Sequence, residues 1–211
     1  MPTSLIVIDD FLTDPDSIRN GALRLQYPPQ EGYFPGRNSA QRARLEGLDQ
    51  VVSRLTGEQL APVENRTSHA KFRVTLGSDV GKGDIHIDHQ ASWSGILYLS
   101  KPEDCQGGTD FFRHIPTNSE RAPINEKEFR EMGFSNASEM VESIIGQDGS
   151  DRSKWEHVMR VPMRYNRLLL LRPWLWHTAG PGFGDTLENG RLVYLLFYNS
   201  PDLARIVNSQ T

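Results

Sequence analysis

The sequence predicts a mainly β fold, a β-sandwich or jelly roll with packed N-terminal helices. Three observations support this class. Helical signals come first, within residues 14–56. Short apolar segments typical of strands then occupy about 69–114 and 160–200, and a long polar segment, about 115–160, separates them. Regular alternation of strands with helices, which would indicate a parallel sheet, is missing from the pattern.

The N-terminal region predicts one strand followed by helices. Residues 5–11, LIVIDDF, form an apolar run of strand length. Asp14 followed by Pro15 is typical of a helix start, because aspartate caps free backbone N–H groups and proline fits the first turn. A stripe of Leu and Val at helical spacing, from Leu45 to Leu55, predicts a second helix.

The rest of the chain predicts short strands punctuated by Gly, Pro and Asp. The expected strands cover 69–76, 84–88, 93–100, 109–114, 165–177 and 190–199. The polar insertion, about 115–160, predicts two short helices and is interpreted either as a lid or as a solvated decoration. We expect one domain over residues 1–211.

Composition argues against several function classes. The net charge is −4 and no basic block is present, so nucleic acid is not an expected partner. The single cysteine, Cys105, excludes an internal disulfide and a cysteine-rich zinc site. No apolar run approaches the ~20 residues of a membrane helix, and the N-terminus does not resemble a signal peptide. We therefore expect a soluble, cytoplasmic protein without a membrane partner, and the pattern leaves its oligomeric state open.

The stretch DIHID, residues 84–88, carries the first candidate site. In a strand, His86 and Asp88 share one face and can bind adjacent positions on one metal ion. Asp84 is a rival carboxylate, because Asp84 and His86 have the same spacing. The best third ligand is His177, which ends an apolar run. Two histidines and one carboxylate leave metal positions open, as in non-haem Fe(II) oxygenases.

Arg191 is the second candidate, because it opens the apolar segment RLVYLLFY. Arg191, Val193, Leu195 and Phe197 share one face of the expected strand. A buried arginine needs a partner, and its fork geometry suits a carboxylate. That carboxylate belongs either to a ligand or to a buried structural residue.

In their order along the chain, these segments resemble a known family. HIDH is followed by GILYLS, GGTDFF, NRLLLLRPWLWH and GRLVYLLFY. Together with the opening VIDDFL, this series is similar to the 2-oxoglutarate/Fe(II)-dependent dioxygenases, especially their prolyl-hydroxylase-like branch. Within that branch the chain resembles a little-characterised bacterial group. The resemblance covers most of the chain.

The resemblance implies a double-stranded β-helix (a jelly roll, cupin-like) in which His86, Asp88 and His177 bind Fe(II). It implies that Arg191 binds the distal carboxylate of the cosubstrate 2-oxoglutarate, and that Tyr98 hydrogen-bonds the same carboxylate. The implied activity uses O2 to hydroxylate a small molecule or a peptide side chain, with release of succinate and CO2.

The chain departs from the family pattern at two points. It has YLS where the branch has YLN, and the gap from His177 to Arg191 is longer than usual. The alternative function is a non-catalytic jelly roll that uses the metal for binding or sensing. A 2-oxo acid anchor at Arg191 favours the enzyme, because a binding module has no need of one.

Overall fold

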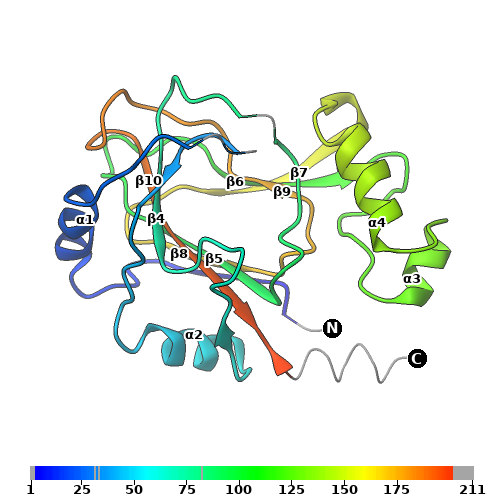
Figure 1. Cartoon of the computed structure of the whole chain (residues 1–211), viewed down its shortest axis with the longest axis horizontal. Coiled ribbons are helices and arrows are strands. Elements are labelled where there is room, and N and C mark those ends of the chain that lie inside the picture. Colours follow the sequence, from blue (N-terminus) through cyan, green and yellow to red (C-terminus); the bar gives the residue numbers. More distant parts are fainter. Residues whose placement is uncertain (1–2, 31, 33, 82, 202–211) are drawn as a thin grey trace.

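Two antiparallel sheets form the centre of the computed structural model, which describes residues 3–30, 32, 34–81 and 83–201 (Figure 1). The ends of the expected domain, residues 1–2 and 202–211, lie outside the described residues. All strand pairs are antiparallel. This arrangement agrees with the predicted jelly roll and excludes a parallel sheet.

The larger sheet has seven strands in the order β1-β8-β5-β10-β4-β2, with β3 paired to β10. Their bounds are β1 Leu5–Ile8, β2 Arg37–Asn38, β3 Ala61–Pro62, β4 Lys71–Thr75, β5 Trp93–Tyr98, β8 Leu168–Leu171 and β10 Arg191–Asn199. The smaller sheet has the order β7-β6-β9, with β6 Gly108–His114, β7 Trp155–Pro162 and β9 His177–Thr178. The predicted strand 165–177 is therefore divided between the two sheets.

Two helices pack on the outer face of the larger sheet. Helix α1, Pro15–Leu23, starts as predicted, because the Asp14 side chain accepts a hydrogen bond from Ser17 N at 3.0 Å. Helix α2, Leu48–Thr56, ends at Gly57, whose φ of 71° needs the freedom of glycine. Val52 of α2 and Ala22 of α1 are fully buried against Phe72 and Leu97 of the sheet.

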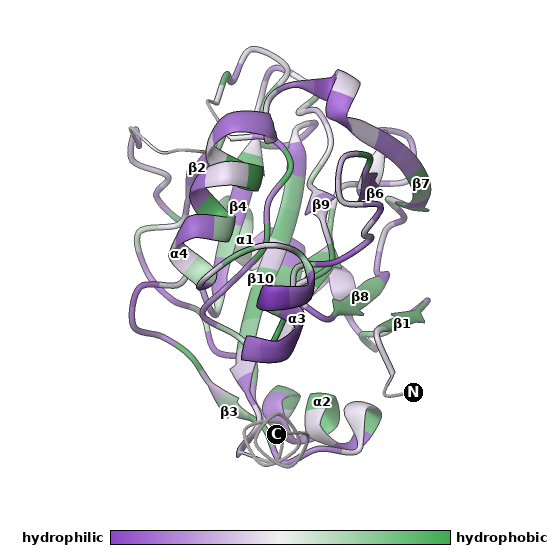
Figure 2. Cartoon of the chain, turned by 90° about the vertical axis from the view of Figure 1, so that its right-hand side faces the viewer, coloured by the Kyte–Doolittle hydropathy of each residue, from purple (hydrophilic) through white to green (hydrophobic). Residues whose placement is uncertain are grey.

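The facing sheets bury a second apolar cluster between them. Tyr98 and Val193 of the larger sheet pack with Phe111 and Val161 of the smaller one. Alternation along β10 explains the division, because Leu192 and Tyr194 pack outward while Val193 points inward. Figure 2 shows mainly hydrophobic residues along β8 and β10 and mainly hydrophilic residues in α3.

The segment between β6 and β7 forms a layer outside the smaller sheet. It contains helix α3, Glu126–Glu131, helix α4, Ala137–Met140, a π-helical stretch, Val141–Asp148, and a 3-10 turn, Arg152–Lys154. Met140 and Ile144 pack on Phe112 and Trp176, so this layer has its own small core. Strand β7 begins at Trp155, inside the expected polar insertion of 115–160. Only its residues Trp155 and Val161 are buried, so its sequence resembles a polar segment.

The prediction of a strand over residues 84–88 is wrong. Only His86 is paired, in a single bridge to His177. The partner strand β9 is two residues long, so no longer ladder forms.

The described residues include no helix that is long and apolar enough to span a membrane.

Candidate metal centre

His86 and His177 are brought together by their own backbones. His86 N donates to His177 O at 2.9 Å, and His177 N donates to His86 O at 3.1 Å. A second contact places Asp88, whose N–H donates to Pro173 O at 3.0 Å. The three residues predicted as ligands therefore meet through pairing between segments that are about ninety residues apart in the sequence.

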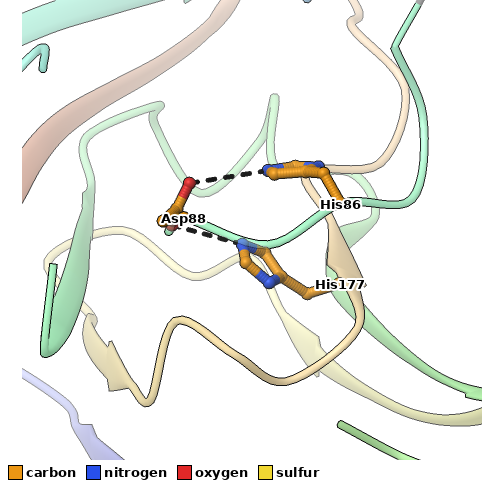
Figure 3. Close-up of side chains that lie close together, drawn as sticks. All are labelled: His86, Asp88 and His177. Carbon is orange, nitrogen blue, oxygen red and sulfur yellow. Dashed lines mark ion pairs between the residues drawn. The ribbon is translucent and has the colours of Figure 1, made fainter. Parts of the chain in front are cut away.

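The side chains of His86, Asp88 and His177 converge on one point (Figure 3). His86 Nε2 lies 3.9 Å from Asp88 Oδ1, and His177 Nε2 lies 3.5 Å from Asp88 Oδ2. One ligand atom from each residue lies within 4.8 Å of the others. This spacing fits donors arranged around a single ion, since metal–N and metal–O bonds of about 2.0–2.2 Å place neighbouring donors about 3 Å apart or more.

Backbone carbonyls orient both imidazole rings. His86 Nδ1 lies 2.8 Å from Asp84 O, and His177 Nδ1 lies 2.7 Å from Leu175 O. A carbonyl only accepts hydrogen bonds, so each Nδ1 carries a proton and each Nε2 is directed toward Asp88. Fixing the ring through the second nitrogen is a common feature of histidine ligands.

The electrostatics of the three groups suit metal binding. Burial, reinforced by the charge of His177, lowers the pKa of His86 to about 4 and keeps it neutral. Burial opposes ionisation of Asp88, but hydrogen bonding and charge from His177 outweigh it and hold the pKa of Asp88 well below its usual range. Burial also lowers the pKa of His177, but its contact with Asp88 outweighs that effect and raises it.

The two rival carboxylates have different partners. Asp84 pairs with Arg152, whose Nε lies 2.7 Å from Asp84 Oδ2. Asp88 Oδ2 instead accepts a hydrogen bond of 2.6 Å from Ser94 Oγ. The geometry favours Asp88 over Asp84 as the carboxylate of the cluster, and the ligand roles themselves stay predictions.

A cavity of about 770 Å³ adjoins the cluster. The inward residues of β10 line it, as the alternation predicts: Arg191, Val193, Leu195 and Phe197. These residues form a continuous wall that links the cluster to Arg191.

Arg191 is buried without a carboxylate partner among the residues that the structure describes. It is 3 % exposed, and its Nε has no hydrogen-bond acceptor. Among the described residues, its only hydrogen bond runs from Nη2 to Gly108 O at 3.5 Å. Burial accordingly lowers the pKa of Arg191. The alternative that Arg191 pairs with a buried structural carboxylate therefore has no support among the described residues.

Tyr98 lies beneath Arg191 rather than on the cavity surface. Its ring centroid is 5.8 Å from the Arg191 guanidinium carbon. Its hydroxyl is fully buried and lies 2.7 Å from Thr109 Oγ1. The Tyr98 hydroxyl therefore already has a hydrogen-bond partner, and its predicted contact with the cosubstrate stays a prediction.

Two residues near the cluster escape sequence reasoning. Ser94 contacts Asp88 from β5, and the Phe34 ring lies 4.3 Å from the His86 ring, centroid to centroid. Ser94 carries a weak signal, because it is a polar residue on the inward face of an apolar strand. Phe34 carries none, because it lies in an irregular Pro/Gly segment far from His86 in sequence.

Solved structures confirm the predicted fold class. HygX from Streptomyces hygroscopicus, solved with nickel, 2-oxoglutarate and hygromycin B, is 16% identical with a TM-score of 0.52 and covers 94% of this chain and 84% of its own. The non-heme alpha ketoglutarate dependent carbocyclase SnoK from nogalamycin biosynthesis is 13% identical with a TM-score of 0.52 and covers 94% and 86%. The fold is thus the double-stranded β-helix of the 2-oxoglutarate-dependent oxygenases.

Sequence comparisons place the chain more narrowly. No curated protein matches it. Residues 2–198 match a family of unknown function, DUF6445. Because this match spans nearly the whole chain, the protein belongs to the DUF6445 family.

Proposed function

We propose that this protein is a non-haem Fe(II), 2-oxoglutarate-dependent dioxygenase. One observation carries the proposal: a His-Asp-His cluster and a buried arginine without a carboxylate partner line the same cavity. The fold adds support, because the similar structures HygX and SnoK are described with 2-oxoglutarate chemistry.

The donor set fits Fe(II). His86 and His177 direct their Nε2 atoms toward Asp88, whose carboxylate is ionised. Two imidazoles and one carboxylate on a divalent ion leave positions open for a cosubstrate and O2. The iron, when bound with 2-oxoglutarate, supplies the oxidising chemistry, with succinate and CO2 as the expected products.

The chain itself positions the cosubstrate and excludes water. Arg191 offers a guanidinium fork to the distal carboxylate of 2-oxoglutarate, which would satisfy its unpartnered Nε. Val193 and Leu195 provide an apolar wall between that anchor and the metal ligands. The primary substrate is proposed to be a small molecule or a peptide side chain that undergoes hydroxylation, because the cavity has room beyond the cosubstrate.

The test is an anaerobic titration of metal-free protein with Fe(II) and then 2-oxoglutarate. The weak visible charge-transfer band of a metal-chelated 2-oxo acid is the readout, and it needs no turnover. We expect the band in the wild type, its loss in His177→Ala, and a requirement for much more 2-oxoglutarate in Arg191→Ala. His114→Ala is a matched control, because His114 contacts Asp148 outside the cavity.

The absence of a band from protein that has bound Fe(II) would overturn the proposal. In that case the alternative from the sequence, a non-catalytic metal-binding jelly roll, becomes the better account. If the band appears, consumption of O2 and formation of succinate in the presence of candidate substrates test the catalytic step separately.

A further inference from the structure

A second arginine lies beside Arg191 on the cavity face of the larger sheet. In the pairing of β4 with β10, Arg191 is opposite Thr75, and Arg73 is opposite Val193. Residues two positions apart on one strand share a face, so Arg73 and Arg191 are diagonal neighbours. Both side chains line the cavity.

Arg73 forms no ion pair with an acid in the described part of the chain. Its donors go to neutral acceptors: Nε to Pro35 O at 3.1 Å, Nη1 to Asn38 Oδ1 at 2.8 Å, and Nη2 to Phe34 O at 2.9 Å. Burial, together with the nearby charge of Arg191, lowers the pKa of Arg73 to about 10, and the charge of Asp79 opposes this only in part. Two adjacent guanidinium charges without a carboxylate repel each other and are costly to bury.

Two other arginines at this cavity are paired with acids, and a third, Arg66, is exposed. Arg152 pairs with Asp84, and Arg160 pairs with Asp110 through two hydrogen bonds of 2.7 and 3.0 Å. Of the cavity arginines that are withdrawn from solvent, the two without an ion pair therefore lie where β4 and β10 meet.

We propose that Arg73 and Arg191 form one two-arginine anion site for the distal carboxylate of 2-oxoglutarate. This inference rests on the proposed function. Arg191 is the direct anchor, and Arg73 is a positioning residue that acts through its charge. The bound carboxylate relieves the repulsion between the two guanidinium groups, so part of its affinity comes from Arg73.

Arg73 also has a structural task that the test must separate from its charge. Its bonds to Phe34 O and Pro35 O hold a segment whose Phe34 ring contacts His86. Loss of that clamp would disturb the metal site for every 2-oxo acid. Loss of the charge would affect only a ligand that carries the distal carboxylate.

The experiment compares two ligands with three proteins. Anaerobic Fe(II) protein is titrated with 2-oxoglutarate and with 2-oxopentanoate, which has the same carbon chain without the distal carboxylate. The proteins are wild type, Arg73→Gln and Arg73→Lys. For Arg73→Gln we expect 2-oxoglutarate affinity to fall on the order of tenfold, while 2-oxopentanoate affinity changes less than about threefold. Arg73→Lys keeps the charge and should retain most of the preference for 2-oxoglutarate.

Equal losses for both ligands in Arg73→Gln would overturn the inference and leave Arg73 a purely structural clamp. If Arg73→Gln does not fold, Arg73→Lys is the deciding variant. Loss of its preference for 2-oxoglutarate over 2-oxopentanoate refutes the inference. A retained preference, with both ligands bound more weakly because the contacts to Phe34 O and Pro35 O are lost, supports it. A wild type that chelates neither ligand would instead refute the proposed function itself.

Discussion

Replacing Arg191 with methionine should make the protein more stable and its cosubstrate binding weaker. The guanidinium is 3 % exposed, and its Nε has no acceptor. Methionine is an unbranched apolar side chain of similar length, and its flexibility lets it fill the site among apolar neighbours such as Val193. A gain in stability together with a loss of 2-oxoglutarate affinity is expected only if Arg191 binds a ligand rather than a residue of the chain.

The magnitudes follow from the burial of an uncompensated charge. Replacing buried ionic groups by apolar residues of similar volume is often neutral or stabilises the fold by about 1–4 kcal/mol. Because Arg191 has no carboxylate partner, we expect its replacement to stabilise the fold. At about 2–4 °C per kcal/mol for a domain of this size, the melting temperature of the ligand-free variant should rise by several degrees. Loss of a buried charged partner should weaken 2-oxoglutarate binding by about 2–5 kcal/mol.

The assay is thermal unfolding of metal-free and Fe(II)-loaded protein with increasing 2-oxoglutarate under anaerobic conditions. A ligand that binds only the folded state raises the melting temperature with its concentration. The wild type should show this rise and Arg191→Met should not. Val193→Met, on the same strand face, controls for the added methionine itself. A ligand-free Arg191→Met protein destabilised by more than about 3 kcal/mol would refute the reasoning, because losses of that size indicate a broken buried pair.

The remaining predictions concern the supports of the site and of the fold. Ser94→Ala removes the 2.6 Å hydrogen bond to Asp88 and should weaken Fe(II) binding about tenfold, whereas Asp84→Asn should leave it unchanged; equal effects in a metal titration would contradict the choice of Asp88. Glu58→Ala leaves the buried Arg172 unpaired over the Trp93 ring and should cost about 3–5 kcal/mol in urea unfolding; a loss under 1 kcal/mol would contradict it. Burial lowers the pKa of His69, so the unfolded chain binds its proton more readily, and stability should fall as the pH drops below about 6.5. His69→Gln should flatten that fall between pH 7.5 and pH 5, and an unchanged slope would exclude His69 as its source.

Much of the fold followed from short-range signals in the sequence. Asp14 and Pro15 marked the start of α1, and inward–outward alternation correctly divided the residues of β10. These features depend on neighbours one to four residues apart, which a sequence displays directly. The exposed middle of β7 gave no such signal, because an edge strand with polar side chains resembles an insertion.

The candidate site shows where local reasoning stops. The order of His86, Asp88 and His177 singled out three candidate donors that the structure brings together, but the alternation argument assumed a strand at 84–88 that does not form. A single bridge between His86 and His177 sets their spacing instead, and Asp84 forms an ion pair with Arg152. Both interactions join residues more than sixty positions apart, so no local pattern encodes them. The same holds for Arg191: the sequence predicted that it is buried, but only the assembled cavity shows that no described acid reaches it. A guanidinium kept at that cost, in the cavity of three convergent candidate metal ligands, favours the proposed dicarboxylate cosubstrate over a purely structural arginine.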